Sequence, residues 1–232
     1  NKVMKTGRLS EFYGTWGKGF YGGKYVQKFE KACSNFFNVK YAISVNSWTS
    51  GLIAAVGALD INPGDEIIVS PWSMCASATS ILHWNAIPIF ADIDKHTFNI
   101  DPIDVEKKIT KRTKAIMSVD IFGHSAPINE LKKIAKKYKL SIISDSAQSP
   151  GAKYNKKFAG TLTDIGGISL NYHKHINTGE GGVIFTNNKK LADRMYLIRN
   201  HAEAVVNQKK VKSLSNLIGY NFRMGEIEAA IG

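Results

Sequence analysis

One lysine lies in a setting that distinguishes it from the others. Lys174 follows the apolar run 165–170 and precedes the turn Gly179-Glu180-Gly181-Gly182, whereas most lysines have polar neighbours at helix-surface spacing. An amine confined in this way suits covalent catalysis, because desolvation lowers the pKa of a lysine and makes it a better nucleophile. Taken alone, the pattern fits a structural lysine equally well.

A carboxylate closes another apolar run. Asp145 follows residues 140–144, which are typical of a buried strand, so we expect its side chain at the carboxyl edge of a sheet, where open α/β folds bind ligands. An ionised carboxylate at that edge can hold the ring nitrogen of a cofactor protonated. Aspartate also begins many helices, and for Asp145 alone a helix cap is the favoured interpretation.

A third segment has the pattern of a phosphate-binding loop. Asn46-Ser47-Trp48-Thr49-Ser50-Gly51 lies between a predicted strand and a predicted helix, so the amides of Thr49 and Ser50 are expected to point outward at a helix N-terminus. The same residues make a good helix cap without any ligand, and that interpretation is favoured when the segment is taken by itself.

The elements that must position these residues alternate along the chain. Apolar runs that indicate strands are separated by patterns that indicate helices, with turn signals at 62–65, 92–94 and 187–188. The expected strands are 41–45, 66–70, 87–91, 114–119 and 140–144, then a pair at 165–170 and 182–186; the expected helices are 49–59, 73–84, 102–109, 129–137 and 189–199. This order predicts an α/β fold, an α-β-α sandwich around a mostly parallel sheet.

Length and charge narrow the class of protein. The 232 residues, 44% of them hydrophobic, suffice for one sizeable domain with a continuous core. A formal charge of +12 makes nucleic-acid binding an alternative, but the lysines are scattered or lie on helix faces, so we expect no nucleic-acid partner. Gly17-Lys18-Gly19-Phe20-Tyr21-Gly22 matches a dinucleotide fingerprint, but no apolar strand precedes it, and we reject that site.

Three further patterns bear on chemistry and location. Cys33 and Cys75 lie in separate apolar segments, which is typical of reduced core thiols rather than of a disulfide. His173 and His175 flank the lysine without a ligand cluster of suitable spacing, so we expect no metal. No membrane-spanning run or secretory signal is visible, so we expect a cytoplasmic protein without a membrane partner.

The ordered segments resemble the DegT/DnrJ/StrS family of sugar aminotransferases, which depend on pyridoxal 5′-phosphate (PLP) and have the aspartate aminotransferase fold type I. Ser169 to Lys174 matches the family spacing S-x-x-x-x-K, and Gly179-Glu180-Gly181-Gly182 matches the G-E-G-G that follows it. Asp145-Ser146-Ala147-Gln148 is similar to the family's D-A-A-Q, and Pro63-Gly64-Asp65-Glu66 to its P-G-D-E turn. The resemblance spans nearly the whole chain.

The resemblance assigns roles around the cofactor ring. It implies that Lys174 binds PLP covalently and moves protons during the reaction. It further implies that Asp145 contacts the pyridine nitrogen and that Gln148 lies near the ring hydroxyl. Both catalytic residues, Lys174 and Asp145, are thereby also cofactor-binding residues.

The resemblance also assigns contacts to the cofactor phosphate. Thr49, Ser50 and Ser169 match positions that meet the phosphate in the same subunit. Asn221, within residues 219–224, matches an asparagine that reaches the phosphate of the neighbouring subunit. The resemblance therefore implies a homodimer with shared active sites.

Two departures from the family pattern leave questions open. Many relatives carry an aromatic residue at the position of Met74 that stacks on the pyridine ring, so stacking here falls to Trp72 or to the thioether of Met74. Family members also continue into a small C-terminal domain. We therefore expect residues 1–232 to be the large PLP-binding domain with its N-terminal segment, as a fragment.

The implied function is amino transfer in polysaccharide biosynthesis. By resemblance, glutamate or glutamine gives its amino group to the cofactor, and a keto sugar, most often nucleotide-linked, then takes it up. One alternative is a sugar dehydratase of the same family, but those relatives carry histidine where this chain has Lys174. The other is a non-catalytic binding or regulatory protein that uses the positive surface.

Overall fold

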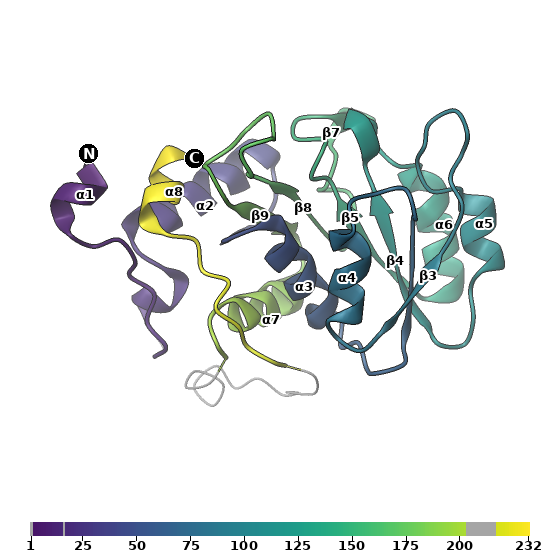
Figure 1. Ribbon diagram of the computed structural model, residues 1–232, viewed down its shortest axis with the longest axis horizontal. Coiled ribbons are helices and arrows are strands. Elements are labelled where there is room, and N and C mark those ends of the chain that lie inside the picture. Colours follow the sequence, from purple (N-terminus) through teal and green to yellow (C-terminus); the bar gives the residue numbers. More distant parts are fainter. Residues whose placement is uncertain (1, 16, 203–216) are drawn as a thin grey trace.

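The computed structural model describes residues 2–15, 17–202 and 217–232, in which helices and strands alternate along most of the chain (Figure 1). The helices are α1 (Lys2–Thr6), α2 (Lys24–Phe37), α3 (Trp48–Ala58), α4 (Ala76–Leu82), α5 (Pro102–Lys107), α6 (Ile128–Tyr138), α7 (Lys189–Arg199) and α8 (Glu226–Ile231), with 3₁₀ turns η1 (Lys18–Tyr21) and η2 (Ile121–Gly123). The strands are β1 (Tyr41–Val45), β2 (Glu66–Val69), β3 (Ile87–Phe90), β4 (Thr113–Val119), β5 (Ser141–Asp145), β6 (Lys153–Tyr154), β7 (Lys157–Phe158), β8 (Ile165–Ser169) and β9 (Gly182–Thr186).

The main sheet has seven strands in the order β1-β9-β8-β5-β4-β2-β3. The pairs from β8 across to β3 are parallel, whereas β9 is antiparallel to both β8 and β1. The other six strands of this sheet therefore end at the same edge. The mostly parallel sheet predicted from the sequence is confirmed, as is the pairing of the two strands before α7.

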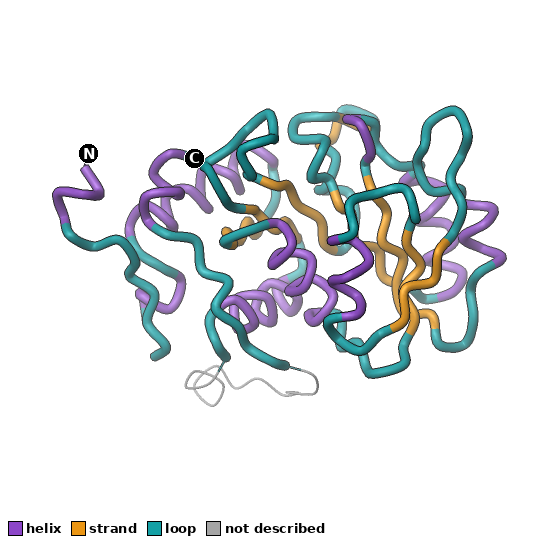
Figure 2. The backbone as a smooth tube through the Cα atoms, in the orientation of Figure 1, coloured by secondary structure: helices purple, strands orange, loops and turns teal. Residues whose placement is uncertain are grey.

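Helices cover both faces of this sheet, as the tube in Figure 2 shows. Helices α3, α4 and α7 pack on one face, and α2, α5 and α6 pack on the other. Because successive strand residues point to opposite faces, Ile67 joins the core beneath α3 while Ile68 joins the core beneath α5 and α6. Burial on both faces explains why the strands are nearly continuous apolar runs.

Polar side chains cap the N-termini of three helices. The side chain of Ser47 accepts a hydrogen bond from the amide of Ser50 at the start of α3. Asp101 and Asn188 cap α5 and α7 in the same way. These caps satisfy amides that have no acceptor within the first helical turn, and they explain why the helices begin where they do.

Polar contacts of buried side chains join α2 to α8 and to α7. The Glu226 carboxylate at the start of α8 accepts hydrogen bonds from the amides of Tyr25 and Val26 at the start of α2. Arg199, at the end of α7, is completely buried and pairs with Glu30 of α2. Buried ion pairs of this kind hold elements in a fixed relation, because separating the charges leaves one of them unpaired.

The structure differs from the sequence-based expectations in three places. Helix α4 begins at Ala76 rather than at Ser73, because residues 73–75 form the turn that leads out of β2. The hairpin of β6 and β7 was not predicted, since its turn uses Asn155 and Lys156 at positive φ instead of a glycine. The expectation of two core thiols is wrong for Cys75, which is exposed, whereas Cys33 is buried.

In the described parts of the chain, no helix combines the length and the apolar character that crossing a bilayer requires.

Candidate active site

A cavity of about 360 Å³ opens at the sheet edge where the parallel strands end. Its lining comes from the segments that follow β1, β2, β5 and β8, together with the end of β4. The lining residues are Ser47, Trp48, Thr49, Ser73, Met74, Ala76, Val119, Asp145, Ala147, Gln148, Ser169, Asn171, Tyr172, His173, Lys174 and Glu180. This is the place where open α/β sheets bind ligands, and the volume is that of a small-molecule site.

The N-terminus of α3 forms one wall of the cavity. Thr49 is exposed and lines it, whereas the Ser50 side chain is buried, with its hydroxyl 2.9 Å from the hydroxyl of Ser47. The Ser50 amide is capped by Ser47, which leaves the preceding amides of the first turn without an intrahelical acceptor. Free amides and the positive end of an eleven-residue helix favour an anion such as phosphate.

Asp145 closes β5 at the floor of the cavity and is almost fully buried. Its Oδ1 accepts hydrogen bonds from the indole of Trp48 at 2.7 Å and from the amide of Ala147 at 3.2 Å. Its Oδ2 accepts a hydrogen bond from the hydroxyl of Ser77 at 2.7 Å. The carboxylate is therefore held in one orientation by donors from three different segments.

Lys174 reaches the same cavity from the loop after β8. Its side chain is half-buried, and its amide donates a hydrogen bond to the carbonyl of Asn171 at 2.8 Å, which closes a tight turn. The following segment returns through Gly181 into β9, where Leu170 donates its amide to the Gly181 carbonyl at 2.9 Å. The lysine is thus held by backbone geometry on both sides, in a site less enclosed than the sequence predicts.

Gln148 and Ser169 also lie in the cavity. The Gln148 side-chain oxygen accepts a hydrogen bond from the amide of Phe122 at 3.0 Å, so its amide nitrogen remains available as a donor. The Ser169 hydroxyl accepts a hydrogen bond from the amide of Asn171 at 3.3 Å and retains its own proton for donation. Both residues therefore present donors to a ligand.

Met74 and Trp72 are placed differently. Met74 lines the cavity with its side chain largely exposed, so its thioether is the stacking candidate that the geometry brings to the site. Trp72 is not among the residues that line the cavity and lies against Phe98, with ring centroids 5.8 Å apart.

Asn221 lies outside the cavity of its own chain. Its carbonyl accepts a hydrogen bond from the side chain of Asn46 at 3.3 Å, and its side-chain oxygen accepts one from Arg223. The amide of Asn46 also bonds to the carbonyl of Phe222 at 3.0 Å. These contacts attach the segment to the loop that precedes α3 and leave the Asn221 side chain exposed.

No sequence pattern singles out Trp48 and Ser77, which are the side-chain donors to Asp145. Trp48 belongs to the segment expected to bind phosphate, but nothing in its spacing indicates that its indole turns towards β5. Ser77 lies 68 positions from its acceptor. Only the fold brings these side chains together, so no local sequence signal identifies them.

A second buried carboxylate lies behind the cavity. Asp120, which follows β4, accepts hydrogen bonds from the hydroxyl of Ser146 and from the amide of Ala126, the latter at 2.7 Å. Burial raises the pKa of Asp120 to about 6, and the nearby charge of Asp145 acts in the same direction. Its backbone amide also donates to the carbonyl of Asp145 at 2.9 Å, so Asp120 braces the end of β5.

The described residues include no cluster of three or more histidine, cysteine or acidic side chains that could hold a metal ion. His173 lines the cavity beside Lys174, but its ring packs against Tyr172, with centroids 3.7 Å apart. Its neighbourhood offers a polar and aromatic surface to a substrate rather than a ligand set.

The residues present fit PLP in kind and in order. The N-terminus of α3 with the hydroxyls of Thr49 and Ser169 supplies donors for a phosphate. Asp145 supplies an oriented carboxylate for a ring nitrogen, and Lys174 supplies the amine. All of them line one cavity, although they come from positions far apart in the sequence.

Comparison with known proteins agrees with a site for PLP. A sequence model of the DegT/DnrJ/EryC1/StrS aminotransferase family matches residues 14–232. GDP-perosamine synthase from Escherichia coli O157:H7 is 41% identical over 210 residues, which cover 90% of this chain and 57% of that enzyme. The chain thus spans little more than half the length of this curated relative.

Solved structures share the fold over almost the whole chain. NtdA from Bacillus subtilis, with bound cofactor PMP, superimposes with a TM-score of 0.84 at 33% identity, covering 99% of this chain and 49% of that one. A GDP-4-keto-6-deoxymannose-3-dehydratase (ColD) H188N mutant with bound GDP-perosamine gives 0.86 at 30% identity, covering 99% and 62%. The predicted PLP-dependent transferase fold is confirmed by these likenesses.

Proposed function

The chain belongs to the DegT/DnrJ/EryC1/StrS aminotransferase family, and on this premise we propose that it is the cofactor-binding part of a PLP-dependent enzyme that moves an amino group from an amino acid to a keto sugar. The observation that carries the proposal is the meeting of Lys174, Asp145 and the N-terminus of α3 in one cavity. Residues 1–232 then form the large domain, and a further part of the enzyme helps to enclose the substrate.

Each side chain would act on a different part of the bound cofactor. PLP, the cofactor of this family, supplies an electron sink that stabilises the charge left when the Cα–H bond of the amino donor breaks. Asp145 would hold the ring nitrogen in its protonated form. Thr49 and Ser169, together with the first turn of α3, would bind the phosphate, and Gln148 would donate to the ring hydroxyl.

Lys174 would have two tasks. Its Nζ amine would bind the cofactor covalently in the resting enzyme, and once displaced by the amino donor it would remove the proton from the donor Cα and return it at the adjacent cofactor carbon. A half-buried amine on a tight turn suits both tasks, because it is held within reach of the cavity yet remains free to move.

A nucleotide-linked keto sugar is the acceptor that the relatives favour, since the name of the Escherichia coli enzyme refers to a GDP-sugar. The cavity adds polar groups that such a substrate needs at its mouth, where Tyr172, His173 and Glu180 are exposed. The amino donor would be glutamate or glutamine. The net charge of +12 favours approach of an anionic substrate in general.

The presence of Lys174 bears on the alternative that the protein is a sugar dehydratase. ColD shows that a sugar dehydratase shares this fold, and its H188N mutant is the form in the matched structure. A chain that keeps the lysine retains the amine needed for covalent attachment and proton transfer at the cofactor. We therefore favour amino transfer, and the product distinguishes the two reactions, because only the transferase leaves nitrogen on the sugar.

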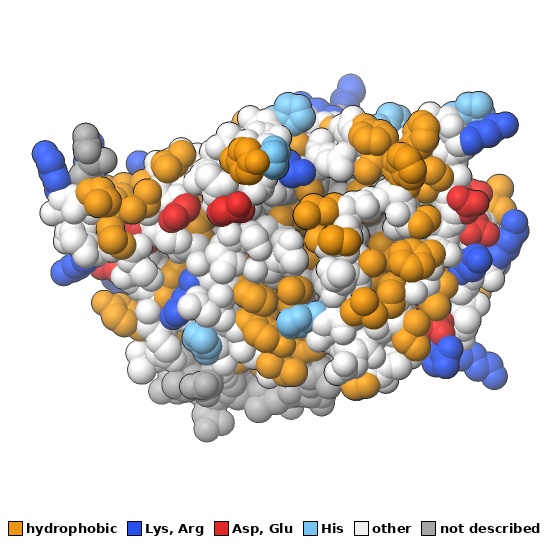
Figure 3. Space-filling view, in the orientation of Figure 1, with side chains coloured by type: hydrophobic (Ala, Val, Ile, Leu, Met, Phe, Trp, Pro, Cys, Tyr) orange, Lys and Arg blue, Asp and Glu red, His pale blue; other side chains and the backbone are white. Residues whose placement is uncertain are grey.

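We further propose a homodimer in a cytoplasmic setting. On the face shown in Figure 3, apolar side chains are spread across the middle while lysines and arginines lie mainly towards the two ends, as expected of a surface that another subunit covers. Asn221, exposed and outside its own cavity, would reach the phosphate bound by the partner subunit. The cytoplasmic setting is supported by an exposed free thiol, Cys75, which suits a reducing compartment.

The test is a reaction with defined substrates. The complete protein, loaded with PLP, is incubated with glutamate and a nucleotide-linked 4-keto sugar, and the sugar product is analysed by mass spectrometry. We expect an amino sugar and 2-oxoglutarate in equal amounts, and borohydride should fix the cofactor to the peptide containing Lys174. Lys174→Ala should lose both signals, whereas a deoxy keto sugar without nitrogen would show a dehydratase instead.

A further inference from the structure

The indole of Trp48 fits a space that glycines leave open. A Cβ atom on Gly167 of β8 would lie 2.2 Å from Cζ3 of this ring, and one on Gly51 of α3 would lie 2.6 Å from its Cε3. At the start of β9, a Cβ atom on Gly182 would lie 2.8 Å from the Trp48 backbone nitrogen. Gly51 and Gly167 thus leave room for the ring, and Gly182 leaves room for the Trp48 backbone, so the position of the tryptophan is built into the fold.

The ring delivers one hydrogen bond to one carboxylate oxygen. A carboxylate has about four acceptor positions. In Asp145, Oδ1 accepts from Trp48 and from the Ala147 amide, while Oδ2 accepts from Ser77. The remaining acceptor position is therefore on Oδ2, on a carboxylate that lines the cavity.

Trp48 is the side-chain donor that fixes the orientation of the carboxylate, and its bond at 2.7 Å is shorter than the one from the Ala147 amide at 3.2 Å. The last torsion of an aspartate side chain is broad, so a carboxylate keeps one orientation only when directed donors hold it. The Ser77 hydroxyl can donate to Asp145 or to Ser73, whose hydroxyl lies 2.9 Å away. An indole N–H can only donate, so its bond to Oδ1 keeps the same direction whatever the serines do.

From this geometry we propose that Trp48 is a positioning residue, which holds Asp145 so that Oδ2 is presented to the ring nitrogen of the cofactor. The inference rests on the proposed function, since it concerns how the carboxylate meets PLP. It adds a specific donor at the start of α3. Through this donor, the proposed phosphate site at the N-terminus of α3 is coupled to the proposed site of the pyridine ring at Asp145. Displacement of one end is then transmitted to the other through a single rigid side chain.

The variant that tests this is Trp48→Phe, which keeps an aromatic ring and removes the donor. Trp84 offers a matched control, because both tryptophans are 5% exposed. Its indole donates at 2.8 Å to the carbonyl of Ile53 rather than to Asp145. Trp84→Phe therefore removes the indole hydrogen bond of an equally buried tryptophan that does not line the cavity. If Trp48→Phe fails to fold, a benzothienylalanine at position 48 replaces the N–H by sulfur with almost no change of shape.

Four quantities are measured on the complete protein: the melting temperature without cofactor, the dissociation constant for PLP, the absorbance of bound cofactor against pH, and turnover per bound cofactor. For Trp48→Phe we expect about tenfold to hundredfold slower turnover per bound cofactor, the range for a bond to a charged group. We also expect weaker PLP binding and a displaced pH profile of absorbance. Trp84→Phe should change only the melting temperature.

Two results would overturn the proposal. One is a Trp48→Phe protein with wild-type PLP affinity, pH profile and turnover per bound cofactor. The other is a loss that follows the melting temperature alone and appears equally in Trp84→Phe, since that is the signature of a structural role. Failure of the proposed function looks different, because the unmodified protein would then show no cofactor absorbance and no peptide labelled by borohydride.

Discussion

At the scale of single residues, the site depends on two carboxylates that lie close together but in different surroundings. Asp145 has donors on both oxygens and lines the cavity. Asp120 lies behind it, is only 1% exposed, and accepts from Ser146 and Ala126. The first is suited to meet a ligand, and the second is suited to hold the turn that carries the first.

Asp145→Asn tests the role of the carboxylate that lines the cavity. The amide keeps the size of the carboxylate but carries no charge, so it stabilises a protonated ring nitrogen poorly. We expect PLP to bind while turnover falls by about a hundredfold or more, the usual effect of removing a charge-stabilising group. Single-turnover kinetics on cofactor-loaded protein measures this, and a near-normal rate would remove Asp145 from the mechanism.

Asp120 predicts a particular dependence of stability on pH. Burial raises its pKa from 3.8 to about 6 in the folded protein. Between about pH 4 and pH 6 the folded state binds this proton more tightly than the unfolded state, so its contribution to the free energy of unfolding falls as pH rises through that window. The full effect is on the order of 3 kcal/mol.

Asp120→Asn should remove this contribution, because the amide oxygen can still accept from the Ala126 amide and the amide nitrogen can donate to the Ser146 hydroxyl, which now donates to Asp120, without titrating. Denaturant unfolding of both proteins between pH 4 and pH 7 measures the difference. We expect the variant to gain stability relative to the wild type as pH rises, with most of the change below pH 6. A difference that stays constant across the range would show that Asp120 does not titrate in this window.

At the scale of elements, the sequence predicts most of what positions the site. Periodicity gives strands 41–45, 140–144 and 182–186 within a residue of β1, β5 and β9, because strands buried on both faces are short apolar runs. The same alternation places Lys174 and Asp145 at one sheet edge before any coordinates are known. The spacing does not reveal which side chains meet across that edge, as Trp48 and Ser77 demonstrate.

The junction of α3 and β9 predicts a sharp effect of one methyl group. A Cβ atom on Gly182 would meet the backbone of Trp48 and Ser47 at 2.8 to 3.0 Å, so α3 or β9 must shift. We expect Gly182→Ala to lower the free energy of unfolding by about 1 to 3 kcal/mol, and PLP affinity to fall with it. Gly14→Ala is the control, since nothing lies within 4 Å of its new methyl group. Equal stability of the two variants would contradict this packing.

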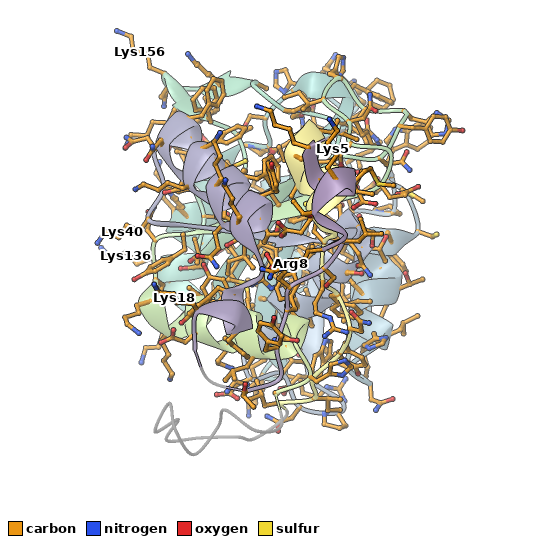
Figure 4. All side chains as sticks on the ribbon, turned by 90° about the vertical axis from the view of Figure 1, so that its left-hand side faces the viewer. Lys5, Arg8, Lys18, Lys40, Lys136 and Lys156 are labelled. Carbon is orange, nitrogen blue, oxygen red and sulfur yellow. The ribbon has the colours of Figure 1, made fainter. Side chains whose placement is uncertain are left out.

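At the scale of the whole molecule, the positively charged side chains and the surface proposed for a second subunit lie in different places. Figure 4 shows Lys40, Lys136 and Lys156 projecting outward at one side of the view, from the residue before β1, from α6 and from the turn between β6 and β7, whereas Lys5 of α1 and Arg8 lie elsewhere on the same face. This scatter agrees with solvated lysines rather than with one binding stripe. The apolar middle of the face in Figure 3 is the surface on which we propose that the second subunit packs.

The proposed sharing of active sites between two subunits gives a quantitative prediction for the complete enzyme. If Asn221 serves the site of the partner subunit, Lys174→Ala and Asn221→Ala affect different subunits of each site. Each variant alone should be nearly inactive. In a mixed dimer one site then carries both defects and the other carries neither, because the intact Lys174 of one subunit meets the intact Asn221 of the other.

Unfolding and refolding an equal mixture of the two variants should therefore restore about one quarter of wild-type turnover, since about half of the dimers are mixed and each has one intact site. A mixture refolded from the double variant and wild type is the control: each site of its mixed dimers carries one defect, so only the wild-type dimers, about one quarter, are active if sites are shared, whereas about half of all sites are intact if they are not. If each site were built from one subunit, every site in the mixture of single variants would carry a defect, and turnover would stay at the level of the separate proteins.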